Sequence, residues 1–299
     1  MTALPRMPRS RYRPGAPPDY THRLHAGNVG DVWKHVALVE VLRRVAAPAA
    51  RVVYVDAHAG EGEYELGATG EWTEGIGRLW TADAAAPLRP YTDLVRRLTT
   101  GTTRPATYPG SPAFARALLG PGAALRLWER DPDAFARLRA HAGDAPRTRI
   151  GCGDGVAALA AELRAAEAEA DDVVALVDPP WSDKADWTAV PDAVAAALRG
   201  TTKSRLLLWY PVKSLTRPNA MHARLEAAGV AGAVAELVTT PLEHRRRRLN
   251  GSGVVLVRPP AGALEALAAA AVPLGARCAT QGGAWSFRMR ALRTPGAAG

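Results

Sequence analysis

The sequence is poor in cysteine and in long apolar runs, and each shortage excludes a class of protein. It contains two cysteines among 299 residues, Cys152 and Cys278. Two thiols cannot build a disulfide framework, and their spacing matches no metal-binding motif. No stretch approaches the roughly eighteen apolar residues of a transmembrane helix, and the basic N-terminus lacks the apolar region of a secretory signal. We therefore expect a reduced, cytoplasmic protein that is not inserted in a membrane and holds no metal.

Lysine is also scarce, yet the chain is strongly basic because arginine is abundant. The 38 Lys and Arg residues exceed the 29 Asp and Glu residues, so the formal net charge is +9. Such a charge favours an anionic partner such as nucleic acid. A bias toward GC-rich codons would also enrich arginine, so the charge supports this interpretation without establishing it.

Strand-like apolar runs alternate with helix-length segments after a flexible basic tail at residues 1–19. The seven runs are residues 51–56, 124–129, 149–154, 172–178, 205–211, 234–238 and 253–257. This alternation predicts βαβ units and a mostly parallel sheet, that is, an α/β fold. The last two runs are separated by a turn-rich segment, so we expect them to form a closing antiparallel hairpin.

One spacing predicts an insertion. In a dinucleotide-type fold, the acid that ends the second strand lies roughly 20 residues after the glycine turn. Here the first such acid after Gly60 is Glu129. We therefore predict an inserted helical subdomain at residues 65–112, within a main domain formed by residues 20–64 and 113–299.

The motif Asp178-Pro179-Pro180-Trp181 directly follows an apolar strand. Ligands of open α/β sheets bind beyond the carboxyl ends of the strands. There Asp178 and the next backbone carbonyl, held extended by the prolines, can accept both hydrogen bonds of an exocyclic amine. The ring of Trp181 can stack on the target base. The motif predicts methyl transfer to a nucleobase amine, although a capping aspartate before prolines would give the same residues.

Weaker signals follow three other predicted strands. Asp56-Ala-His-Ala-Gly60-Glu-Gly62 is a tight glycine turn without the spacing of a pyrophosphate loop, and it suits the methionyl end of S-adenosylmethionine. Glu129 can hold ribose hydroxyls, and Asp154-Gly155 can bind the adenine amine of that cofactor. Each signal is weak alone, but together with Asp178 they predict a methyltransferase cofactor cleft.

Two further clusters have ordinary explanations. Asp31 is placed to cap a helix that begins there, after the polar segment that starts at His25. A zinc site from His22, His25 and His35 lacks supporting thiolate or carboxylate spacing. The run His244-Arg-Arg-Arg-Arg248 is a solvated loop or, in a nucleic-acid enzyme, a phosphate contact.

These motifs resemble those of the bacterial 23S ribosomal RNA adenine-N6 methyltransferases. The matching segments lie in family order: Tyr20 with His25-Ala-Gly-Asn28; Asp31-Val-Trp-Lys34-His35; Asp56-Ala-His58-Ala-Gly60; Gly62-Glu-Tyr64; Gly70-Glu-Trp-Thr-Glu-Gly75-Ile; Tyr108-Pro-Gly-Ser111-Pro; Glu129; Asp154-Gly155; Asp178-Pro-Pro; Trp209-Tyr-Pro211; and Ser252-Gly. They extend from about residue 20 to residue 260. The His-Ala-Gly-Asn and Tyr-Pro-Gly-Ser-Pro segments are far more specific than Asp-Pro-Pro.

The resemblance implies a class I (Rossmann-like) S-adenosylmethionine-dependent methyltransferase with a seven-stranded sheet and a small helical insertion. Its implied reaction is N6 methylation of adenine 2030 in 23S ribosomal RNA, by a monomer that acts on protein-free RNA or an early assembly intermediate. Implied cofactor contacts are His35, His58, Ser111, Glu129, Asp154, Gly155 and Asp178. Implied substrate contacts are Tyr20, His22 and Lys34.

The chain departs from the family pattern at Trp181, where the usual residue is tyrosine. An indole still stacks, so we expect activity to survive the change. Three alternatives stay open: a DNA adenine-N6 methyltransferase, a protein glutamine methyltransferase, and a catalytically silent RNA-binding protein of the same fold. No separate DNA-recognition domain is apparent in the sequence, and the intact Asp178 motif argues against the silent protein.

Overall fold

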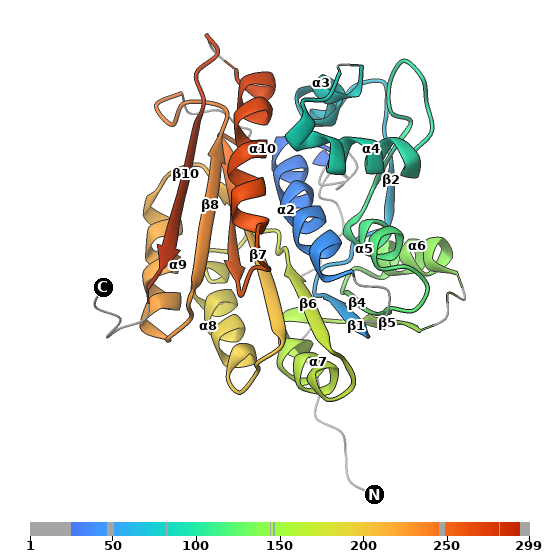
Figure 1. The fold of residues 1–299 in the computed structure, drawn as a ribbon, viewed down its shortest axis with the longest axis vertical. Coiled ribbons are helices and arrows are strands. Elements are labelled where there is room, and N and C mark those ends of the chain that lie inside the picture. The colour runs from blue at the N-terminus through green and yellow to red at the C-terminus, as the bar shows by residue number, and fades with distance from the viewer. Residues whose placement is uncertain are drawn as a thin grey trace, which may run out of the picture.

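The computed structural model describes residues 25–46, 51–81, 83–143, 145, 147–244, 249–280 and 282–293. Residues 1–19, Tyr20, His22 and Arg245–Arg248, which carry several of the expectations above, lie outside these described residues. An eight-stranded sheet forms the centre, with strand order β10-β8-β9-β7-β6-β1-β4-β5 (Figure 1). Its strands are β1 (Val52–Asp56), β4 (Ala124–Glu129), β5 (Thr148–Cys152), β6 (Asp172–Val177), β7 (Ser204–Val212), β8 (Gly232–Val238), β9 (Gly251–Val257) and β10 (Ser286–Leu292).

The strand directions confirm a mostly parallel α/β sheet. Strands β5, β4, β1, β6 and β7 pair in parallel, and the predicted antiparallel hairpin is β8 with β9. The eighth strand, β10, adds to the seven expected strands and pairs antiparallel with β8 at the edge. Its sequence alternates apolar residues with Arg288 and Arg290, which form ion pairs with Glu236 and Glu226. It therefore lacks the continuous apolar run from which the other strands were predicted.

Helices cover both faces of the sheet. One face packs against α2 (Val29–Val45), α5 (Ser111–Leu119), α6 (Pro132–Ala142) and α10 (Ala263–Cys278), and the other against α7 (Gly155–Glu169), α8 (Asp186–Leu198) and α9 (Thr216–Ala227). Successive strand side chains point to opposite faces. Tyr54 therefore belongs to the first core, whereas Val53 and Val55 belong to the second. Burial on both faces explains why the parallel strands are continuous apolar runs.

The expectation that Asp31 caps the first described helix is wrong, because α2 begins at Val29 and its cap is Asn28. The Oδ1 atom of Asn28 accepts a hydrogen bond from the backbone N–H of Asp31 at 3.0 Å. Asp31 lies one turn inside, and its Oδ2 accepts from the N–H of Gly27 at 3.0 Å. This reciprocal arrangement resembles a capping box. It fixes the start of a buried helix that carries Lys34 and His35.

Residues 65–112, which we predicted to be an insertion, contain short helices and one strand. These elements are η1 (Glu71–Glu74), α3 (Ile76–Trp80), η2 (Ala86–Leu88), α4 (Arg89–Leu98) and β3 (Thr107–Pro109), which pairs with β2 (Glu63–Glu65). Figure 1 shows α3 and α4 together beside α2. Treating them as a separate subdomain stays a prediction.

The strand order changes direction at β1 and so locates a crevice. From β1 the chain passes to β4 and β5 on one side, and then to β6 and β7 on the other. Ligands of such sheets bind at this switch point, beyond the carboxyl ends of the strands. Asp56 ends β1 there, and Asp178 directly follows β6. Within the described ranges, no helix is both long enough and apolar enough to span a membrane.

Candidate active site

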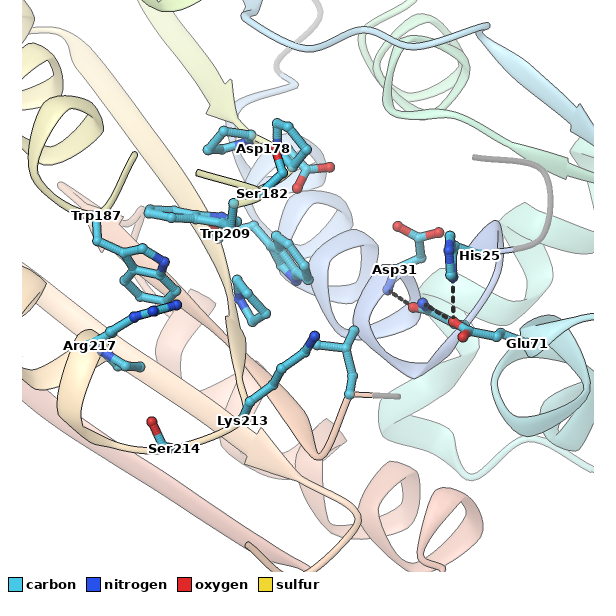
Figure 2. A pocket seen from close by; sticks show the side chains of 17 residues that line it. His25, Asp31, Glu71, Asp178, Ser182, Trp187, Trp209, Lys213, Ser214 and Arg217 are labelled. Atoms are coloured by element: carbon cyan, nitrogen blue, oxygen red, sulfur yellow. Dashed lines mark hydrogen bonds and ion pairs between the residues drawn. The ribbon is translucent and has the colours of Figure 1, made fainter. Parts of the chain in front are cut away.

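Two cavities open at this edge of the sheet and share the wall formed by Pro179, Pro180 and Ser182. The first has a volume of about 640 Å³; its lining includes His58, Gly60, Tyr64, Glu129, Asp131, Asp154, Gly155, Asp183, Asp186 and Val190. The second has a volume of about 460 Å³; its lining includes His25, Asn28, Asp31, Glu71, Asp178, Trp181, Trp187, Trp209, Lys213, Ser214 and Arg217 (Figure 2). We call them the cofactor cavity and the acceptor cavity.

Asp178 is held by a cation from the buried helix α2. Lys34 Nζ lies 2.5 Å from Asp178 Oδ2 and 2.7 Å from Asp31 Oδ1, and Lys34 is 8 % exposed. Burial alone would lower the pKa of Lys34, but the two carboxylates raise it above its ordinary value. Lys34 therefore remains an ammonium ion beside Asp178. The backbone N–H of Asp178 also donates to His58 Nδ1 at 3.2 Å.

The cofactor cavity contains acceptors that its own backbone holds in place. Glu129 Oε2 accepts from the N–H of Gly60 at 2.9 Å, and Oε1 accepts from the N–H of Asp131 at 2.8 Å. A carboxylate has about four acceptor sites, so both oxygens keep capacity for hydroxyl groups. Asp154 Oδ1 caps α7. A Cβ on Gly155 would come within 2.2 Å of the carbonyl oxygen of Ala57, so only glycine permits this close approach.

These residues fit S-adenosylmethionine. The volume of about 640 Å³ is that of a small-molecule site, and Glu129 faces it with acceptors for a ribose. The N–H of Gly60, a residue with φ +62°, donates to Glu129 at this turn. The predicted Gly60, Glu129 and Asp154 groups thus line one cavity.

Asp56 does not line this cavity, so the prediction that it belongs among the cofactor acids needs correction. Its carboxylate is 0 % exposed and accepts from Tyr54 OH at 2.7 Å, Ser111 Oγ at 2.6 Å and the N–H of His58 at 3.1 Å. Burial raises the pKa of Asp56 to about 6, although these three donors oppose the shift. Asp56 therefore stabilises the glycine turn from the protein interior, through the N–H of His58.

His35 and Ser111 lie apart from the cofactor cavity. They line a space of about 30 Å³ that shares His58 and Tyr64 with the larger cavity. His35 Nδ1 is 2.8 Å from Tyr108 OH, and burial, with a contribution from Lys34, lowers the pKa of His35 well below its ordinary value. His35 is therefore a neutral ring within the core.

Trp181 forms part of the cavity wall rather than a free platform. It is 7 % exposed, its Nε1 donates to the carbonyl oxygen of Trp209 at 3.0 Å, and its ring centroid lies 4.4 Å from that of Trp187. Its φ of +52° is unusual for a residue other than glycine. Trp209 is half-buried in the same cavity and lies 5.9 Å, ring centroid to Nζ, from Lys34.

Sequence reasoning assigned no role to Trp187, Trp209, Lys213 or Arg217, all of which line the acceptor cavity. A signal was available for three of them. Trp209 lies in the C-terminal half of the predicted strand that became β7, and Lys213 and Arg217 follow that strand, on the edge where Asp178 follows β6. His25, considered as a zinc ligand, instead lies 2.9 Å from Glu71.

Together, the parallel sheet with its terminal hairpin, the crevice at its switch point and the Asp-Pro-Pro loop define a class I methyltransferase whose cofactor is S-adenosylmethionine. A family described as "Ribosomal RNA large subunit methyltransferase D, RlmJ" matches residues 49–290. The chain belongs to this family, which confirms the resemblance.

Two relatives and one solved structure support this assignment. The chain is 34 % identical over 252 residues to "Ribosomal RNA large subunit methyltransferase J" of Escherichia coli (strain K12), covering 81 % of this chain and 87 % of that protein. It is 31 % identical over 248 residues to the protein of the same name from Haemophilus influenzae, with the same coverage. Protein LPL1258 from Legionella pneumophila superimposes with a TM-score of 0.79 at 23 % identity, covering 89 % of this chain and 98 % of that one, and so shares the fold.

Proposed function

We propose that the protein transfers a methyl group from S-adenosylmethionine to N6 of an adenine in 23S ribosomal RNA, namely adenine 2030. The proposal depends on the wall that the cofactor cavity and the acceptor cavity share. The Asp178 loop separates a cavity fitted for the cofactor from a cavity lined by indoles. One amine held at Asp178 would then face both cavities.

The cofactor would supply an electrophilic methyl group on a sulfonium. We assign its ribose to Glu129, its adenine to Asp154 and Gly155, and its methionyl end to His58 and the turn at Gly60. We assign His35 and Ser111 to the support of His58 rather than to direct cofactor contact, because the three residues line one small space. Ser111 donates to Asp56 at 2.6 Å, and Asp56 accepts from the N–H of His58. That chain of contacts fixes the turn on which the cofactor would lie.

At the acceptor, Asp178 and the backbone carbonyl after it would accept the two N6 hydrogen atoms. Two such hydrogen bonds draw the nitrogen lone pair out of conjugation and direct it toward the cofactor cavity. Lys34 places an ammonium ion beside the Asp178 carboxylate, and a carboxylate has about four acceptor sites in all. The proton released from N6 can pass to Asp178 or to water. The protein thus contributes mainly by positioning the reacting atoms.

The adenine must leave its stack to reach this depth. Trp209 is the half-buried indole of the cavity, so we assign it a stacking face, with Trp181 behind it as the wall. Tyr20, His22 and Lys34 stay our proposed substrate contacts, the first two outside the described residues. As the resemblance implies, we also propose a cytoplasmic monomer that acts on free 23S RNA or an early assembly intermediate.

The test is methyl transfer from labelled S-adenosylmethionine to protein-free 23S ribosomal RNA, intact ribosomes, duplex DNA and total protein. We expect label in the free RNA, at N6 of adenine 2030 after nuclease digestion. Label confined to DNA or to glutamine would identify another acceptor. Cofactor binding with no transfer to any substrate would identify a silent RNA-binding protein.

A further inference from the structure

The charges that line the acceptor cavity fall into two groups. Its three acids all have cationic or hydrogen-bonding partners on the side of α2 and η1. Asp31 and Asp178 share Lys34, at 2.7 and 2.5 Å, and Glu71 lies 2.9 Å from His25 Nδ1. Glu71 also accepts from Asn28 Nδ2 at 3.0 Å. This side of the cavity is polar, and each of its three acids already has a partner.

The opposite side presents cations alone. Lys213 directly follows β7, and Arg217 lies in the first turn of α9; both are exposed. Among the described residues, no hydrogen bond or ion pair involves either side chain. Figure 2 shows both side chains on the far side of the cavity from Asp178, with Ser214 between them in the chain.

We propose that Lys213 and Arg217 bind the phosphodiester that flanks the acceptor adenosine, an inference that rests on the proposed function. A nucleotide has a neutral base and an anionic phosphate. The cavity offers partnered acids where the base amine would lie and two cations at its other end. Its volume of about 460 Å³ is sufficient for one such ligand.

The chemistry of the two cations suits this role. A guanidinium offers a planar pair of donors to phosphate oxygens, and an ammonium adds a compact charge. Neither side chain has to break an existing ion pair before it binds RNA. The contact would therefore add binding free energy and orient the strand, while Asp178 and the carbonyl after it would position the amine for transfer. If both were merely solvated charges, their loss would act no differently from the loss of other exposed arginines.

The first experiment compares two double variants of equal charge. Lys213→Gln/Arg217→Gln removes the proposed subsite. Arg164→Gln/Arg199→Gln removes two exposed cations, one in α7 and one directly after α8, that line neither cavity. With a 23S RNA hairpin at moderate salt, we expect the first variant to raise KM about tenfold with kcat changed less than about twofold. We also expect the slope of log KM against log salt to fall by about one to two. The control should keep wild-type values.

The second experiment modifies the RNA. A methylphosphonate beside the target adenosine removes the phosphate charge and should raise the wild-type KM by the same factor. It should leave the KM of Lys213→Gln/Arg217→Gln unchanged, because the partner is already absent. Additive effects of the methylphosphonate and Lys213→Gln/Arg217→Gln would overturn the subsite, and so would a rise of KM for unmodified RNA in Arg164→Gln/Arg199→Gln equal to that in the first variant. S-adenosylmethionine binding should be unaltered throughout. A wild-type protein that methylates no RNA would instead refute the proposed function, so the two failures are distinguishable.

Discussion

Asp56 ends β1 and Asp178 directly follows β6, the neighbouring parallel strand, so both are aspartates at the carboxyl edge of the sheet. Their surroundings differ. Asp56 is fully buried among the neutral donors Tyr54 and Ser111 and the backbone of His58. The side chain of Asp178 is 16 % exposed, lines the acceptor cavity and pairs with an ammonium ion.

The difference shows that position at a strand end does not by itself decide what an acid does. Hydroxyl donors hold Asp56 without a compensating cation, so burial raises its pKa to about 6. Asp178, in contrast, has an ammonium ion beside it, because Lys34 Nζ lies 2.5 Å from Asp178 Oδ2 and also contacts Asp31. We therefore assign Asp56 to the support of the glycine turn and Asp178 to the substrate.

The largest expected effect is that of Asp178→Ala on methyl transfer. Loss of the acceptor at the amine should lower kcat by roughly 10²–10³-fold, the range seen when one positioned catalytic group is removed. Single-turnover transfer to the RNA hairpin would measure it, and circular dichroism would check the fold. Asp56→Asn is the matched control and should retain kcat within about fivefold. Equal losses in the two variants would break the comparison, and full activity of Asp178→Ala would refute the assignment.

Lys34→Met tests whether the cation accounts for the difference between the two acids. The substitution leaves Asp31 and Asp178 without their shared cation in a site where Lys34 is 8 % exposed. Unpairing a buried ion typically costs about 3–5 kcal/mol. Urea unfolding should show a loss of that order. Lys203→Met, at an exposed lysine that donates to the carbonyl oxygens of Glu167 and Ala170, should cost less than about 1 kcal/mol. Similar midpoints of urea unfolding for the two variants would contradict the prediction.

Asp56→Asn should change how stability depends on pH. The folded protein holds the Asp56 proton to about pH 6, whereas an unfolded chain releases it near pH 4. Because the folded state binds more protons in this window, the wild type loses stability as pH rises through it, by about 3 kcal/mol, and regains none above it. The variant lacks this proton. The wild-type minus variant free energy of unfolding should fall by that amount between pH 4 and 7; a constant difference would contradict it.

Local sequence predicted the strands and the acids after them because buried parallel strands are continuous apolar runs that end in polar residues. It also predicted the Asp178 motif and the loop at Gly60. It could not predict that Asp56 points inward and Asp178 outward, because both follow the same kind of strand. That choice depends on Lys34, which is 144 residues from Asp178 in the chain, and on Ser111, 55 residues from Asp56.

The smallest expected effect concerns the third residue after each of the two acids. The third residue after Asp56 is Ala59, whereas the third after Asp178 is Trp181, which bonds the carbonyl of Trp209 through Nε1 at 3.0 Å. Trp181→Tyr keeps an aromatic ring against Trp187 and meets the same positive φ. It loses one partly buried neutral hydrogen bond, worth about 1 kcal/mol, so kcat/KM should fall about fivefold at most.

Trp181→Ala separates the two contributions of this side chain. It removes the hydrogen bond and also the ring that supports Trp187 and the cavity wall, so kcat/KM should fall about tenfold to a hundredfold. Steady-state kinetics on the RNA hairpin would compare wild type, Tyr and Ala side by side. If Tyr is as damaging as Ala, then the indole N–H that holds the Trp209 backbone determines the pocket. The ring surface would then be secondary, and the tyrosine usual at this position could not replace this tryptophan.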